Sequence, residues 1–351
     1  MSPVRTSGVA LAELTTLRVG GPAGHLVEVE RDDQLVEAVA AADRSGEPVL
    51  VLGGGSNLLV ADAGFPGTVV TVRTSGLRSE DGTAVTVAAG EDWDDVVART
   101  VDEGLAGLEC LSGIPGRTGA TPIQNVGAYG QEVAQTITGL RAWDRQARAV
   151  VTLDPPACGF AYRHSRFKAE PGRWVVLDVT FRLERSALSA PVRYAELARV
   201  LGIEVGRRAP LAQVREAVLG LRRSKGMVLD AADHDTWSAG SFFTNPVLDA
   251  ATSLALPSAA PRWPQPDGRV KTSAAWLIEQ AGFGKGFALG APDGPSTARA
   301  RLSTKHTLAL TNRGGASAAD LLELARAIRA GVRERFGVEL VPEPVLVGVT
   351  L

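Results

Sequence analysis

Three short segments of the chain combine reactive side chains with glycine, proline or aromatic residues in patterns that a hydrophobic core does not need. The segment YRHSRFK places Arg163 beside a phenol, and such a guanidinium can bind a carboxylate or stabilise an enolate in a dry pocket. The segment SAGSFFTNP sets the hydroxyl of Ser241 directly before two aromatic rings. In VPEP, two prolines flank Glu343, whose carboxyl can keep a proton for acid chemistry if it is buried.

Each of these residues also fits an ordinary structural role. Arg163 could belong to a solvated cluster of charges at a strand end. The hydroxyl of Ser241 could bond to the backbone of a turn, and Glu343 could lie in an exposed turn. Ser241 does not belong to a G-x-S-x-G nucleophile elbow, because Phe243 stands where the second glycine would be. The sequence GKG around Lys285 offers an ammonium that can bind a phosphate.

Two glycine-rich loops are the strongest sign of a bound cofactor. Residues 113–130 (GIPGRTGATPIQNVGAYG) contain too many glycines, prolines and small polar residues for a helix or a central strand. Residues 53–57 (GGGSN) follow a short apolar strand predicted at 49–52. Their backbone N–H groups can receive phosphate or flavin oxygens, so the two loops together predict a large nucleotide cofactor. Taken alone, residues 53–55 fit an ordinary turn equally well.

The loop at 53–57 does not match the Rossmann dinucleotide fingerprint. Gly53 and Gly55 supply G-x-G, but Leu58 occupies the position of the third glycine. The residues that follow are not clearly helical, so the usual dinucleotide-binding motif is absent from this loop.

Composition places the chain among globular proteins with sizeable cores. Its 351 residues predict two or three domains, and 45% hydrophobic residues exclude a disordered chain. The net charge of −2 argues against general nucleic-acid binding.

The cysteines and histidines do not predict a metal site. Cys110 and Cys158 form no C-x-x-C motif, and neither His164 nor His306 has other metal-ligating residues at a suitable spacing. We therefore expect buried thiols and no metal. Without a signal peptide or a run of about 18 apolar residues, we expect a cytoplasmic protein that does not enter the membrane.

Hydrophobic periodicity predicts a mixed α/β protein. The chain begins as an α/β unit, becomes rich in strands, and ends in a long amphipathic helix; the proline-rich residues 257–268 predict a loop. We predict strands at residues 26–29, 49–52, 68–72, 84–87, 139–143, 149–153 and 174–183, and helices at residues 33–44, 93–103, 211–226 and 318–336.

Taken together, these segments resemble the UDP-N-acetylenolpyruvoylglucosamine reductase family over nearly the whole chain. Several motifs in one order are more specific than any single motif. The matching segments are TTLRVGGPA at 15–23, GGGSN at 53–57, the loop at 114–130, Tyr162–Arg163, GSFF at 240–243 and Pro342–Glu343.

The resemblance implies a fold and a division into domains. It implies an FAD-binding fold of the vanillyl-alcohol-oxidase (PCMH) type with two subdomains, followed by a smaller α+β substrate-binding domain. We expect the first subdomain at 1–66, with 335–351 returning near it, the second at 67–226, and the substrate domain at 227–334. We also expect a monomer.

The resemblance also implies the chemistry, a step of peptidoglycan precursor synthesis. NADPH reduces bound FAD, and a hydride then passes to the enolpyruvyl group of UDP-N-acetylglucosamine enolpyruvate, which gives UDP-N-acetylmuramate. Ser241 then resembles the proton donor, while Arg163 and Glu343 resemble the pair that stabilises the enolate.

Binding residues follow from the same resemblance. The positions that match its FAD contacts are Gly53, Gly54, Gly55, Ser56, Asn57, Gly113, Ile114, Pro115, Gly116, Gly119, Thr121, Ile123, Gln124, Asn125 and Arg222. Those that match its substrate contacts are Tyr129, Tyr162, Tyr194, Lys225, Asn245, Lys285 and His306, with Tyr194 on a loop typical of the family's first subtype.

The chain departs from the family pattern at three positions, and two other functions stay open. Thr244 stands where lysine is common, Thr121 where serine or alanine is frequent, and Val345 where an arginine is often found. The alternatives are a flavin oxidase of the same fold, which passes electrons to oxygen, and a sugar-nucleotide sensor without catalysis.

Overall fold

The computed structural model describes residues 4–79, 81–290 and 297–351, and these divide into two compact units. Unit 1 comprises Met1–Val9, Ala23–Gly54 and Pro66–Val228; unit 2 comprises Ala10–Pro22, Gly55–Phe65 and Leu229–Leu351. The chain therefore passes from unit 1 to unit 2 inside the predicted GGGSN loop. The three-part division expected from the sequence stays a prediction.

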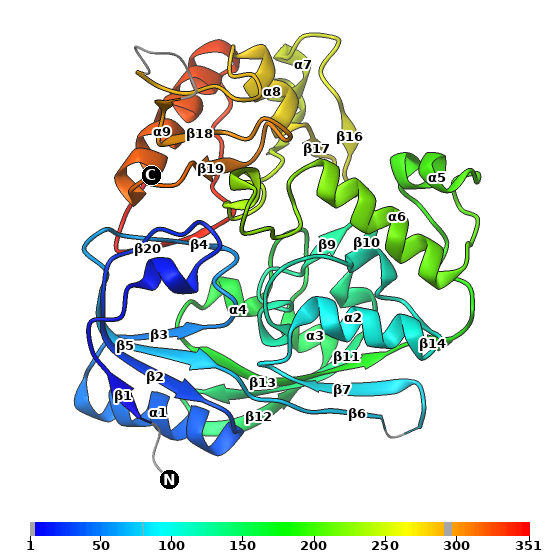
Figure 1. The fold of residues 1–351 in the computed structure, drawn as a ribbon. Helices are drawn as coiled ribbons and strands as arrows, with labels where there is room; N and C mark the ends of the chain where they lie inside the picture. The colour runs from blue at the N-terminus through cyan, green and yellow to red at the C-terminus, as the bar shows by residue number, and fades with distance from the viewer. Residues whose placement is uncertain (1–3, 80, 291–296) are drawn as a thin grey trace. The chain divides into compact units, whose positions relative to one another are not determined.

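In its described residues, unit 1 contains two main sheets, two further two-stranded sheets and six α-helices. Figure 1 shows their arrangement. The helices are α1 (Asp32–Ser45), α2 (Trp93–Asp102), α3 (Pro155–Cys158), α4 (Arg166–Ala169), α5 (Ala195–Leu201) and α6 (Leu211–Ser224). The strands are β1 (Arg5–Thr6), β2 (Ala23–Val29), β3 (Val49–Leu52), β5 (Phe65–Val72), β6 (Leu77–Ser79), β7 (Ala84–Ala88), β8 (Leu105–Ala106), β9 (Gly127–Ala128), β10 (Gln131–Glu132), β11 (Ile137–Asp144), β12 (Ala149–Leu153), β13 (Trp174–Arg182) and β14 (Glu184–Arg185).

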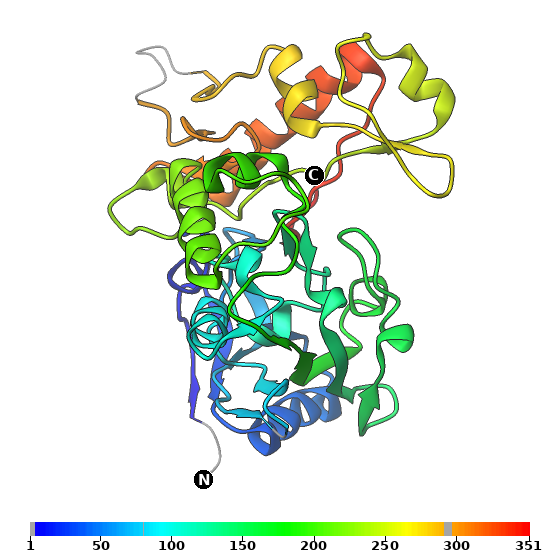
Figure 2. The same ribbon diagram turned by 90° about the vertical axis from the view of Figure 1, so that its right-hand side faces the viewer.

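The two main sheets of unit 1 differ in strand direction. The first has the order β1-β2-β5-β3, in which β3 and β5 are parallel, while the second, β12-β11-β13-β7-β6, is antiparallel throughout. Apolar side chains of both sheets and of α1 share one buried cluster, which includes Val27, Leu35, Val70 and Leu177. Helix α1 is the blue helix near the N-terminus in Figures 1 and 2.

Local signals explain why α2 and α6 form where the periodicity predicts them. Asp92 caps α2 by accepting hydrogen bonds from the first-turn N–H groups, and the valine stripe of the helix is buried. On α6, Val214 and Val218 pack with Leu197 of α5 in one cluster that also contains Cys110. Each helix therefore presents one apolar face to its neighbours.

Unit 2 is organised around its last helix. It contains α7 (Ala250–Ala255), α8 (Ala274–Gln280), α9 (Ala318–Phe336), β4 (Leu58–Val60), β15 (Val247–Leu248), β16 (Trp263–Pro264), β17 (Val270–Lys271), β18 (Ala300–Leu302), β19 (Leu310–Asn312) and β20 (Val345–Val347). The C-terminal strand β20 pairs in parallel with β4. Ser317 and Asp320 form a capping box at the start of α9, and Asp62 accepts from the N–H groups of Ala318 and Ala319.

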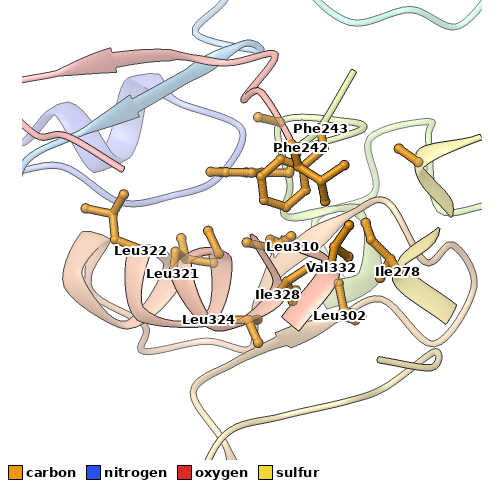
Figure 3. Close-up of a cluster of buried hydrophobic side chains, with 14 of the residues drawn as sticks. Phe242, Phe243, Ile278, Leu302, Leu310, Leu321, Leu322, Leu324, Ile328 and Val332 are labelled. Carbon is orange, nitrogen blue, oxygen red and sulfur yellow. The ribbon is translucent and has the colours of Figure 1, made fainter. Parts of the chain in front are cut away.

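The core of unit 2 surrounds the apolar stripe of α9. Leu321, Ile328 and Val332 are fully buried there, together with Phe242 and Phe243 (Figure 3). The two phenylalanine rings lie 5.1 Å apart in an edge-to-face arrangement. This packing gives the residue before them, Ser241, a rigid support.

The predicted mixed α/β fold is confirmed, and so are the predicted strands and helices, with ends shifted by a few residues. Two expectations need correction. The cluster around Arg163 is not at a strand end but in a tight turn that leads into α4. The proline-rich segment 257–268 is not wholly loop, because β16 pairs at the edge of a small sheet, where proline is tolerated. Both cysteines are buried and free, as expected, and none of the helices in the described residues is long and apolar enough to cross a membrane.

Candidate active site

The two glycine-rich loops approach each other within unit 1. A Cβ atom placed on Gly54 would lie 2.7 Å from the Cα of Gly116, and one on Gly53 would lie 3.3 Å from the Cβ of Arg117. A Cβ on Gly119 would meet that of Ala89 at 2.5 Å. A side chain at Gly54 or Gly119 would collide with the neighbouring segment, so close packing explains why glycine stands at both positions.

Substitution of Gly54 tests this close approach. We expect Gly54→Ala to lower the midpoint of thermal unfolding and to cost about 1–3 kcal/mol, because backbone rather than a mobile side chain blocks the new methyl group. The control is Gly220→Ala in α6, where a Cβ meets nothing within 4 Å. That change should stabilise the protein by about 0.5–1 kcal/mol, and equal effects of the two substitutions would contradict the close contact.

Arg222 reaches the loop at Gly113 from helix α6. Its Nη2 donates to the carbonyl of Met227 at 2.7 Å, and its Nε would lie 3.4 Å from a Cβ on Gly113. This Nε is buried without a hydrogen-bond partner among the described residues. Burial lowers the pKa of Arg222 to about 10, so the guanidinium stays charged at neutral pH. A buried charge with an unused donor fits a polar or anionic ligand group beside the loop.

Two predicted loop residues use their side chains within the protein. The amide of Asn125 donates to Glu132 at 2.8 Å and to the carbonyl of Ala161 at 3.2 Å, and its oxygen accepts from the N–H of Ala134. The hydroxyl of Thr121 donates to the carbonyl of Thr118. Both side chains are buried, and their hydrogen bonds hold the shape of the loop.

Arg163 lies against the end of the same loop. Its Nη2 donates to the carbonyl of Gly127 at 2.8 Å, and its guanidinium carbon lies 5.3 Å from the ring centroid of Tyr162. Arg163 has φ = 51°, a left-handed conformation that is unfavourable for arginine. The bridge between Ala161 and His164 closes this turn and holds that conformation.

Tyr129, Tyr194 and Lys225, three of the predicted substrate contacts, lie close together on unit 1. The two tyrosine rings meet edge to face at 5.4 Å, and the Lys225 ammonium lies 5.8 Å from the Tyr129 ring centroid. Burial raises the pKa of Tyr129 to about 12, so its phenol remains a hydrogen-bond donor at neutral pH.

Backbone hydrogen bonds join the segments of unit 2 that carry Ser241, His306 and Glu343. The N–H of Glu343 donates to the carbonyl of Phe242 at 2.9 Å, and the N–H of Phe242 donates to the carbonyl of Leu308 at 2.7 Å. The hydroxyl of Ser241 lies 3.5 Å from Nε2 of His306. The three joined segments carry a hydroxyl (Ser241), an imidazole (His306) and a carboxyl (Glu343).

Three other predicted residues, Asn57, Asn245 and Lys285, also lie in unit 2. The side-chain N–H of Asn57 donates to the carbonyl of Glu343 at 3.3 Å, so the second half of the GGGSN loop joins this group. Asn245 accepts from the N–H of Ala274 at the start of α8. Lys285 is exposed on the loop that follows α8.

Two acidic residues that organise unit 1 were not predicted from the sequence. Asp94 accepts from the N–H of Gly113 at 2.6 Å and pairs with both Nη atoms of Arg215. Glu196 binds the ammonium of Lys225 at 2.6 Å. Each lies in the first turn of a helix, where acidic residues are common, so no local signal distinguishes them.

Comparisons with known proteins agree along the length of the chain. The model of the UDP-N-acetylenolpyruvoylglucosamine reductase C-terminal domain matches residues 232–347, and that of an FAD binding domain matches residues 23–152. UDP-N-acetylenolpyruvoylglucosamine reductases of Streptomyces avermitilis and Thermobifida fusca are both 58% identical to the chain, over 97% and 98% of it and 94% and 98% of their own lengths. The crystal structure of such a reductase from Thermus caldophilus matches with a TM-score of 0.66 and 27% identity, covering 99% of each chain.

Proposed function

The chain belongs to the UDP-N-acetylenolpyruvoylglucosamine reductase family, and from this membership we propose how its residues divide the work of the reaction. The protein is an FAD-dependent oxidoreductase that acts on UDP-N-acetylglucosamine enolpyruvate. NADPH is the proposed source of electrons, and UDP-N-acetylmuramate is the product.

The glycine-rich loops and Arg222 fit FAD. Gly54 and Gly116 approach closely with no side chain between them, and Arg222 supplies a buried guanidinium with an unused donor beside Gly113. When bound, FAD supplies the hydride that it has accepted from NADPH. The proposed contacts also include Gly53, Gly55, Ser56, Asn57, Ile114, Pro115, Gly119, Thr121, Ile123, Gln124 and Asn125.

The proton chemistry is assigned to Ser241 and the charge stabilisation to Arg163 and Glu343. Reduction of the enol ether at its terminal carbon leaves negative charge on the adjacent carbon, delocalised into the carboxylate as an enolate. A guanidinium and a protonated carboxyl stabilise such an enolate through charge and hydrogen bonding. The Ser241 hydroxyl donates its proton to the carbon, since a carbanion is a far stronger base than an alkoxide.

Binding of the sugar nucleotide is assigned to a second set of residues. Lys225 and Lys285 neutralise the diphosphate, and Tyr129 donates a hydrogen bond from a phenol that stays protonated. Tyr162, Tyr194, Asn245 and His306 complete the proposed contacts.

The observation that carries the assignment is the hydrogen bond between the Glu343 N–H and the Phe242 carbonyl. This bond ties the segment of Glu343 to the segment of Ser241 within unit 2, which supports a joint role for the two residues. A protein that only bound the sugar nucleotide would have no need of a proton donor there, which disfavours the sensor alternative.

A visible absorption spectrum tests the proposal. The purified protein should be yellow, anaerobic NADPH should bleach it, and UDP-N-acetylglucosamine enolpyruvate should restore the colour faster than oxygen does. Rapid recovery with oxygen and no response to the sugar nucleotide would support a flavin oxidase. Binding of the sugar nucleotide without recovery of colour would support a sensor, and a protein that stays colourless with added FAD would refute all three.

We further propose that the enzyme acts as a monomer in the cytoplasm. Its substrate is a sugar nucleotide of peptidoglycan synthesis, and activity there links the enzyme to cell-wall growth, cell shape and division. Light scattering of the purified protein in the range of working concentrations would reveal a dimer if this is wrong.

A further inference from the structure

Lys225 is already paired with an anion of the protein. Its ammonium lies 2.6 Å from Oε2 of Glu196, and the two side chains are only 29% and 34% exposed. Lys225 is the C-cap of α6, where its N–H bonds back to the carbonyls of Arg222 and Arg223. The cation therefore projects from a rigid helix end toward a carboxylate on the neighbouring helix.

Glu196 stands in a segment that also carries a proposed substrate contact. It is the second residue of α5, and Tyr194 is the N-cap of this helix. Leu197, which is fully buried, anchors helix α5 on α6. The two helices are neighbours in Figure 1. The Tyr194 ring is 43% exposed and meets Tyr129, whose ring also lies near Lys225.

We propose that Glu196 is a positioning residue that holds the Lys225 ammonium until the diphosphate of the sugar nucleotide displaces it. The inference rests on the proposed function, in which Lys225 binds the diphosphate. A carboxylate and a diphosphate repel each other when they share one ammonium, so the ligand must replace Glu196 or bind beside a like charge.

Displacement of Glu196 also links anion binding to the Tyr194 segment. The ion pair with Lys225 ties the first turn of α5 to the end of α6, whereas Leu197 anchors the rest of the helix. When the diphosphate binds the Lys225 ammonium, the ion pair that holds the first turn of α5 is broken. The adjacent Tyr194 can then move onto the ligand. Glu196 thus keeps Lys225 oriented in the ligand-free protein and, because it must be displaced, lowers the affinity for the sugar nucleotide.

The test is Glu196→Gln, measured in the FAD-loaded enzyme with uridine diphosphate as the probe. Glutamine has nearly the same shape but no charge, so we expect the Kd for uridine diphosphate to fall about three- to tenfold at low salt. The difference in Kd between the variant and wild type should become smaller as salt is added, because it arises from the removal of a charge. The KM for the sugar nucleotide should fall by a similar factor, with kcat changing less.

Three further variants separate this role from a general effect on the fold. Glu216→Gln removes a carboxylate from an exposed ion pair with Arg223 on α6 and should leave the Kd unchanged. Glu196→Asp keeps the charge and should stay close to the wild-type Kd. In a Lys225→Met background, Glu196→Gln should no longer tighten binding of uridine diphosphate, since the ammonium for which Glu196 and the ligand compete is absent.

The inference is overturned if Glu196→Gln binds uridine diphosphate no more tightly than wild type, or if the gain persists without Lys225. Failure of the proposed function looks different. In that case the wild-type enzyme itself does not consume the sugar nucleotide, whatever the variants bind.

Discussion

Ser241→Ala should leave bleaching of the flavin by NADPH intact and slow its recovery with UDP-N-acetylglucosamine enolpyruvate by about 10²–10⁴-fold, the usual contribution of a positioned proton donor. The hydroxyl is the proposed donor, and its segment is held by the buried rings of Phe242 and Phe243. Alanine should therefore remove the proton without moving the backbone. Single-turnover absorbance measurements resolve the two half-reactions separately.

A threonine in the same loop provides the matched control for Ser241. Thr244 follows the two phenylalanines, and its N–H bonds to the carbonyl of Val341. Thr244→Ala removes a hydroxyl from the same segment and should change the recovery rate less than about threefold, because this hydroxyl bonds the carbonyl of Val341 and has no assigned role in the reaction. Recovery at the wild-type rate in Ser241→Ala would remove Ser241 from the mechanism.

Arg163→Met should lower kcat/KM by about 10²–10³-fold while the purified protein keeps its flavin, because the proposed guanidinium stabilises charge that appears only during the reaction. Any residue other than glycine bears the strain of φ = 51°, so methionine does not add to it. Arg163→Lys retains a charge but loses the planar fork, and its activity should lie between those of wild type and Arg163→Met. Steady-state kinetics and flavin absorbance provide both measurements.

Arg166 is the control for the loss of a nearby positive charge. It lies three residues further on, in α4, and makes a 3.5 Å ion pair with Glu170 at the surface. Arg166→Met should retain nearly full activity, because exposed ion pairs contribute little. If both substitutions reduced kcat/KM equally, the effect would come from the general electrostatic field, and Arg163 would have no specific role.

Much of the fold could be predicted from the sequence because its elements follow local rules. The apolar stripe of α9 and the valine stripe of α2 were visible in the residue pattern, and both helices form where the pattern places them. The cluster around Arg163 was misplaced at a strand end. Its turn depends on the bridge between Ala161 and His164 and on the hydrogen bond from Arg163 to Gly127. Hydrophobic periodicity in the sequence gives no signal for either contact.

The candidate site was predicted as a set of residues but not as an arrangement. The glycine loops and the Ser241 and Glu343 motifs could be read directly, since their composition is unusual for a core. Asp94 and Glu196 could not, because each looks like an ordinary acidic residue in the first turn of a helix. Their importance comes from partners elsewhere in the chain, Arg215 and Lys225.

By itself, then, the sequence determined the types of element, the cofactor-binding character of the loops and the chemical groups available. These depend on short-range periodicity, backbone freedom and side-chain chemistry, which neighbouring residues specify. Only the tertiary structure decided that Gly54 lies against Gly116, that Glu343 bonds to Phe242, and that Glu196 holds Lys225. Such contacts join segments far apart in the chain, and the path of the whole backbone selects them.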